Sequence, residues 1–242
     1  MWNSTINCLV ALLFLAGCGD STGPGRTPPE IVWEQTNAWE QNAPNEAWVT
    51  AIAINSSGNI FAGTIIGVFR STDNGDSWTE VNTGLTQLII LSLAINPSGD
   101  VFAGTQLGGI FRSTDNGDSW TAVNTGLTNL LVYSLVINSS GDIFAGTQMG
   151  GVFRSTDNGD NWTAVNTGLS NTISTLAINS SDHIFAGISA PGVFRSTDNG
   201  GNWTDVSTGL TAGGVICFAF NPAGQIFAGT INGVFRSVEP TI

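Results

Sequence analysis

The chain repeats itself with a period of about 42 residues. The string Ser-Thr-Asp-Asn-Gly-Asp-Ser-Trp-Thr begins at Ser71 and again at Ser113, and close copies begin at Ser155 and Ser196. Three other markers recur in the same register and add a fifth copy: an Asn that ends an apolar run, a Phe-Ala-Gly triplet and a Phe-Arg-Ser triplet. Self-similarity at this period predicts an array of like units that share a continuous core with their neighbours.

Each unit reads as four short strands. In the third unit we expect them at 132–138, 143–146, 152–155 and 162–166, separated by Ser-Gly, Gly-Gly and Asn-Gly turn signals. No later stretch carries a sustained apolar period of 3.6 residues, so helices are not expected. Four antiparallel strands in a unit of this length are typical of a propeller blade. The sequence therefore predicts an all-β fold, a five-bladed β-propeller of four-stranded antiparallel blades.

The fifth unit stops after Arg236 and Ser237, without the repeated turn and the fourth strand. The segment 33–37, Trp-Glu-Gln-Thr-Asn, matches the fourth strand at 120–124 in its Trp and its Asn. We predict that this N-terminal strand closes the last blade and leaves no free sheet edge there. A monomer is then expected, and the alternative is an open array that exchanges blades between chains.

The N-terminal residues have the pattern of a targeting signal. The apolar run 8–17 is too short to span a bilayer but fits the core of a signal peptide. It ends in Leu-Ala-Gly-Cys at Cys18, which resembles a bacterial lipobox; the resemblance implies cleavage before Cys18 and lipidation of its thiol. We therefore expect a signal peptide at 1–17, a flexible tether at 18–30 and the propeller at 31–242, in the bacterial cell envelope on the outer membrane or cell surface. The alternative is an ordinary secretory signal.

The repeated turn resembles the Asp-box (BNR) motif S-x-D-x-G-x-[S/T]-W, with Asn161 and Asn202 departing from it in the last two copies. Propellers with this motif include sialidases, xyloglucanases, sortilin-like receptors and photosystem II assembly factors. We expect the Asp to accept N–H bonds across the turn, the Gly to permit a positive φ, and the Trp to tie the third strand to the fourth. The residues given these structural roles are Asp73, Gly75, Trp78, Asp115, Gly117, Trp120, Asp157, Gly159, Trp162, Asp198, Gly200 and Trp203.

The sequence lacks the residues that several classes of function require. The formal net charge of −12 disfavours nucleic acid and anionic lipid headgroups, so membrane contact is expected through the lipid anchor only. The three cysteines have no metal-binding spacing, and the repeated turns lack the oxygen set of a calcium loop, so no metal or cofactor is expected.

A catalytic site is not predicted either. A sialidase-like site needs an arginine cluster and a Tyr nucleophile, but five of the six arginines occupy one repeated position and Tyr133 is the single Tyr. Glycoside hydrolysis usually needs two facing carboxylates. On the face where propeller enzymes usually place their catalytic residues, only Glu40 and Glu46 are available. The single histidine, His183, lies in a turn between a first and a second strand, on the opposite face. We assign no catalytic residue.

In a propeller, the loops between second and third strands share one face with the loops that join successive blades. The repeats differ most in these loops, as expected of a recognition surface on a rigid frame, and sequence drift in unconstrained loops would give the same pattern. Candidate ligand-binding residues there are Trp39, Trp48, Gln106, Gln148 and Asn232. The two tryptophans are read either as stacking or anchoring residues or as buried staples. The sequence predicts a non-catalytic envelope module that binds a glycan or a protein; the alternatives are a divergent sialidase-like glycoside hydrolase and an assembly factor for an envelope complex.

Overall fold

The computed structural model describes residues 47–169, 172–211 and 213–238, and these form strands and turns. The first sheet contains β1 (Val49–Ile54), β2 (Ile60–Thr64), β3 (Gly67–Ser71) and β4 (Thr79–Glu80). The second contains β5 (Ile90–Ile95), β6 (Val101–Thr105), β7 (Ile110–Ser113) and β8 (Thr121–Ala122). The third contains β9 (Val132–Ile137), β10 (Ile143–Thr147), β11 (Gly151–Ser155) and β12 (Thr163–Ala164).

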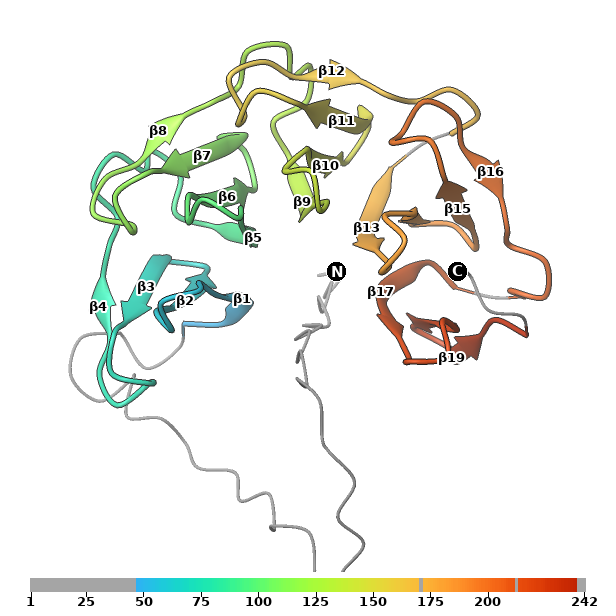
Figure 1. Cartoon of the computed structure of the whole chain (residues 1–242), viewed down its shortest axis with the longest axis horizontal. Helices are drawn as coiled ribbons and strands as arrows, with labels where there is room; N and C mark the ends of the chain where they lie inside the picture. Colours follow the sequence, from blue (N-terminus) through green and yellow to red (C-terminus); the bar gives the residue numbers. More distant parts are fainter. Residues whose placement is uncertain (1–46, 170–171, 212, 239–242) are drawn as a thin grey trace, which may run out of the picture.

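The fourth sheet contains β13 (Ile173–Ile178), β14 (Ile184–Ile188), β15 (Val193–Ser196) and β16 (Thr204–Asp205), and the fifth contains β17 (Val215–Phe220), β18 (Ile226–Thr230) and β19 (Gly233–Arg236). Neighbouring strands in every sheet are consecutive in the chain and antiparallel. The sheets follow one another along an arc, with β1, β5, β9, β13 and β17 on its inner side (Figure 1). The fold is that of a five-bladed β-propeller, as predicted.

The fourth strands are shorter than predicted, because their flanking residues bond elsewhere. The predicted strand 120–124 contains only β8, Thr121–Ala122. The N–H of Trp120 donates to the Thr83 carbonyl of the preceding blade at 2.9 Å. The Asn124 Oδ1 accepts the Ile110 N–H at 2.8 Å, next to the loop that enters β7. A period-2 pattern in the sequence cannot separate these contacts from strand pairing.

The core lies between blades. Trp120 is buried against Phe61 and Val81 of the first blade and Phe111 of its own, and its Nε1 donates to the Val81 carbonyl at 2.7 Å. These repeated tryptophans therefore tie neighbouring blades together. The first copy differs, since the Nε1 of Trp78 donates to the Gly75 carbonyl within its own turn at 3.2 Å.

Arginines join the same neighbours at the outer side of the arc. Arg112 Nη1 donates to the Asn158 carbonyl at 2.6 Å and to Asp160 Oδ1 at 2.8 Å, both in the next blade. Arg70 makes the equivalent bonds to Asn116 and Asp118. The carbonyl contact is the better shielded of the two, because the Asp160 side chain is 60% exposed.

We expect the two contacts of Arg112 to differ in their contribution to stability. Asp160→Asn removes an exposed ion pair and should lower the free energy of unfolding by less than about 1 kcal/mol. Arg112→Gln also removes a charged hydrogen bond to a backbone carbonyl and should cost about 2 kcal/mol. Chemical denaturation of both variants checks this order, and an equal loss from the two would contradict it.

The fifth blade has three strands within the described residues, and the segment predicted to supply its fourth strand, 33–37, lies outside them. The Val234 side chain of β19 is 74% exposed, whereas its counterparts in the other blades are at most 7% exposed: Val68, Ile110, Val152 and Val193. Figure 1 shows the first and last sheets at opposite ends of the arc. Among the described residues, no strand therefore pairs with the outer edge of β19.

Candidate functional site

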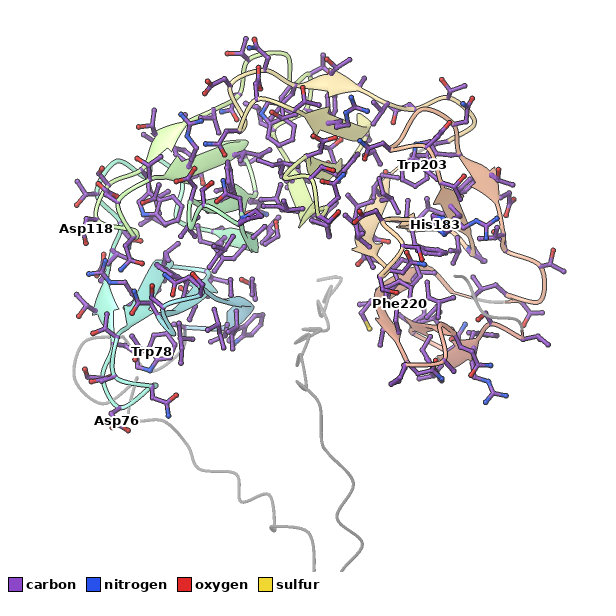
Figure 2. The ribbon with its side chains drawn as sticks, viewed as in Figure 1. Asp76, Trp78, Asp118, His183, Trp203 and Phe220 are labelled. Carbon is purple, nitrogen blue, oxygen red and sulfur yellow. The ribbon has the colours of Figure 1, made fainter. Side chains whose placement is uncertain are left out.

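The first carboxylate of each repeated turn is bonded inside that turn. Asp73 Oδ1 accepts the Ser77 N–H at 2.9 Å and the Ser71 hydroxyl at 2.8 Å, and its other oxygen accepts the Ser77 hydroxyl. Asn74 and Gly75 follow with φ of 62° and 96°, which closes the turn. Figure 2 shows Asp76 and Asp118, from the first and second turns, at the outer edge of the arc. No group of three or more His, Cys, Asp or Glu within the described ranges is arranged to hold a metal ion.

The bonds from Ser77, together with that from Ser71, lower the pKa of Asp73 from 3.8 to about 2. The equivalent bonds from Ser119 and Ser113 lower the pKa of Asp115 to about 2. A carboxylate whose pKa falls on folding stabilises the fold above its unfolded pKa, and this contribution is lost as the pH falls through the folded value.

We therefore expect the carboxyl carbons of Asp73 and Asp115 to titrate with midpoints near pH 2 in a 13C NMR experiment. The melting temperature should fall between pH 4 and pH 2, as these groups take up protons. Midpoints near the ordinary value of 3.8 would show that the turn bonds do not form in solution.

A second surface lies at the opposite ends of the strands, and we call it the rim. It comprises the loops between second and third strands (65–66, 106–109, 148–150, 189–192 and 231–232) and the segments between blades (81–89, 123–131, 165–169 and 206–211). The two kinds of loop touch: the Gln106 N–H donates to the Ile89 carbonyl at 3.0 Å, and the Gln148 N–H donates to Leu131 at 3.1 Å. Ile65 is bonded to Trp48 in the same way at 3.3 Å.

The rim carries no charged residue in these loops, although the chain is strongly acidic. Three of the loops instead project a large apolar side chain into solvent: Leu107 is 65%, Met149 80% and Ile231 76% exposed. Trp48, beside the first loop, is 71% exposed. An uncharged surface with exposed apolar side chains on several blades is unusual for a protein with so many carboxylates, so the rim is the candidate binding surface.

Hydroxyl groups hold these loops in shape. The Thr105 Oγ1 donates to the Gly109 carbonyl and accepts the Gly108 N–H, both at 2.9 Å. Thr147 makes the same pair of contacts with Gly151 and Gly150. The exposed Leu107 and Met149 are thus carried on fixed turns, which lowers the entropy lost when a partner binds.

The structure brings part of the predicted ligand set to this surface. Gln106 and Asn232 are exposed on the rim, Gln148 is half-buried there, and Trp48 lies beside it. Trp39 lies outside the described residues. The exposure of Leu107, Met149 and Ile231 was not predicted. Each lies one or two residues after a repeated Thr, in a loop bounded by Gly or Asn, and this position outside the strands indicates an exposed side chain.

A cavity runs along the inside of the arc. It measures about 330 Å³ and is lined by the first strands of all five blades, including Tyr133. Two of its hydroxyl groups bond between blades: Thr50 Oγ1 donates to the Ile90 carbonyl at 2.6 Å, and Ser174 Oγ donates to the Val215 carbonyl at 2.5 Å. Among the described residues, no charged side chain lines it.

The groups considered for catalysis lie apart from one another. Tyr133 faces the inner cavity, whereas His183 lies in the turn between β13 and β14, and Figure 2 shows it on the fourth blade. Arg70 and Arg112 are engaged between blades at the repeated turns. Within the part of the chain that the structure describes, no helix is long and apolar enough to cross a membrane.

Comparison with known proteins supports the fold. Residues 111–214, somewhat less than half of the chain, match the DUF6242 beta propeller domain. No curated protein matches the chain at a significant level.

Among solved structures, the extracellular domain of the one-component system BT4673 from B. thetaiotaomicron is similar over 84% of this chain and 28% of its own, at 18% identity and a TM-score of 0.69. The GH74 xyloglucanase from Xanthomonas campestris is similar over 78% of this chain and 36% of its own, at 16% identity and a TM-score of 0.64. YCF48 bound to D1 peptide is similar over 77% and 63%, at 18% identity and a TM-score of 0.59. The chain thus spans under a third of BT4673, and at these identities the likeness establishes a β-propeller fold.

Proposed function

We propose that this chain is a non-catalytic binding module of a bacterial cell envelope that recognises a protein through the rim. The observation that carries the proposal is the uncharged rim with Leu107, Met149 and Ile231 exposed on fixed turns. Side chains of this kind gain free energy when an apolar partner surface removes them from water, roughly 25 cal/mol for each Å². A sugar offers many hydroxyl groups and little apolar surface in comparison.

The envelope location rests on the lipobox resemblance at Cys18, with 1–17 as signal peptide and 18–30 as tether. The similarity to an extracellular domain of B. thetaiotaomicron agrees with it. The peptide bound to YCF48 is an instance of protein recognition on a propeller of similar fold. We infer that the repeated turns are Asp boxes with a structural role, because their carboxylates are engaged inside the turns.

Site-specific photo-crosslinking in the source bacterium tests the proposal. A benzophenone amino acid placed at Leu107 or at Met149 should give the same discrete protein adduct. The control position is Ser140, which is exposed in the turn between β9 and β10 on the opposite face. Adducts of equal yield from Ser140, or none from the two rim positions, would contradict the proposal.

A glycan is the second candidate, favoured by the exposed Trp48 indole beside a rim that also presents the Gln106 amide. Aromatic rings stack on sugar faces and amides bond to hydroxyl groups. A glycan array probed with the full chain and with Trp48→Ala decides this candidate. Binding that Trp48→Ala abolishes would replace the protein partner with a carbohydrate, and an array without binding would leave the protein partner as the proposal.

A further inference from the structure

The interface between the fourth and fifth blades has a cavity where the three preceding interfaces have a tryptophan. Trp120, Trp162 and Trp203 fill those three interfaces. The cavity at the last interface measures about 470 Å³. Its lining residues Phe185, Val193, Val206, Leu210, Ile226, Ala228 and Phe235 correspond in sequence position to Phe61, Val68, Val81, Leu85, Val101, Ala103 and Phe111, which surround Trp120. The cavity therefore has the lining of an indole site.

The hydrogen-bond acceptors for such an indole are in place. Trp120 donates its Nε1–H to the Val81 carbonyl and its backbone N–H to the Thr83 carbonyl, at 2.7 and 2.9 Å. Trp162 and Trp203 repeat both bonds one blade further along. The corresponding residues at the last interface are Val206 and Thr208, and both line the cavity.

The surroundings of two glycines also indicate open space at this interface. A Cβ added at Gly126 would lie 2.1 Å from the Trp162 carbonyl oxygen, whereas one added at Gly209 meets nothing within 4 Å. A Cβ added at Gly151 would lie 2.3 Å from the Asn166 side chain, whereas one added at Gly233 meets nothing. The last blade thus has space for both a Trp and the Asn four positions after it.

Arg195 also differs from its counterparts in the earlier blades. Its counterparts Arg70 and Arg112 bond to the turn that precedes the tryptophan of the next blade. The Arg195 Nε is buried, lines the cavity and has no hydrogen-bond partner among the described residues. A buried N–H donor without an acceptor is costly, so the Nε of Arg195 calls for a carbonyl or carboxylate oxygen.

The geometry points to residues 33–37 of the same chain as the occupant: Trp33 fills the cavity, Asn37 covers Gly233, and the segment pairs with the free edge of β19. Trp33 is the one tryptophan outside the four repeated turns that has an Asn four residues later. Glu30 precedes Trp33 by three residues in the sequence, and Asp118, the partner of Arg70, precedes Trp120 by two. Ten residues lie between Asn37 and Trp48, against six between Asn82 and Ile89, so the linker can reach the first blade.

Three glycine variants of the full chain test whether the site is filled. Gly209 and Gly141 both have φ of 88° and open space around them, so an alanine meets only backbone strain at either position if the cavity stays empty. With Trp33 bound, Gly209→Ala should instead lower the melting temperature by about 5 °C more than Gly141→Ala, approaching the loss caused by Gly126→Ala. Equal melting temperatures for Gly209→Ala and Gly141→Ala would overturn the inference.

A cysteine pair identifies the source of the strand. By the register in which Arg112 pairs with Thr121, Arg236 should lie opposite Glu34. Glu34→Cys with Arg236→Cys should form a disulfide within one chain, found by mass spectrometry in the monomer, whereas Gln41→Cys with Arg236→Cys should not. A disulfide between two chains, or none in the first pair, would contradict closure by the same chain.

Discussion

Replacing Trp162 by alanine is expected to lower the free energy of unfolding by about 4 kcal/mol and the melting temperature by roughly 12 °C. The indole is 4% exposed and packs against Phe102 and Val123 of one blade and Phe153 of the next. Its Nε1–H donates to the Val123 carbonyl at 2.8 Å. The substitution leaves a large cavity between two blades and an acceptor without its donor.

Trp78→Ala is the matched control, because this first copy of the tryptophan is half-buried and bonds to Gly75 of its own turn. We expect it to cost less than half as much as Trp162→Ala, as measured by thermal and urea denaturation. Equal losses from the two substitutions would mean that the repeated tryptophan acts within its turn and not between blades.

Gly126→Ala is expected to destabilise the fold by about 3 kcal/mol, although it adds a single methyl group. Gly126 has φ of 89°, and the added Cβ would lie 2.1 Å from the Trp162 carbonyl oxygen. That carbonyl cannot easily move, since the Trp162 N–H is bonded to the Thr125 carbonyl at 2.8 Å. The clash therefore separates the second and third blades at the point where they are joined.

Gly141→Ala separates the clash from backbone strain, because Gly141 has the same φ within a degree and nothing within 4 Å of its added Cβ. We expect a cost of about 1 kcal/mol from the left-handed backbone alone. A difference of less than about 1 kcal/mol between the two variants in chemical denaturation would contradict the close approach at Gly126.

The blades were predictable because each repeat contains every local signal that its strands and turns need. The partners of the repeated residues were harder to predict. The Arg70 guanidinium bonds to Asn116, 46 residues later, and this separation is close to the repeat period itself. In an array of near-identical units, a contact within a unit and a contact with the next unit involve the same residue types. The curvature of the array decides between them, and no single unit specifies it.

The rim residues show a second limit. Gln106 was chosen as a candidate for its polar side chain, and the structure places it on the rim, exposed. Leu107 and Met149, which the structure exposes, are residue types that usually lie in a core. Their exposure follows from the turns that the Thr105 and Thr147 hydroxyls close, and these turns join strands that pair with each other.

The central claim, that the rim is the binding surface, is tested most directly by the affinity of the protein captured in the photo-crosslinking experiment. Leu107→Asp combined with Met149→Asp places charge on the rim of the second and third blades, and Ser98→Asp combined with Ser140→Asp places it on the opposite ends of the same blades. We predict that the rim pair weakens binding at least about 30-fold and shifts the melting temperature by less than about 2 °C, whereas the control pair leaves the affinity unchanged. An unchanged affinity for the rim pair, or an equal loss for the control pair, would contradict the account.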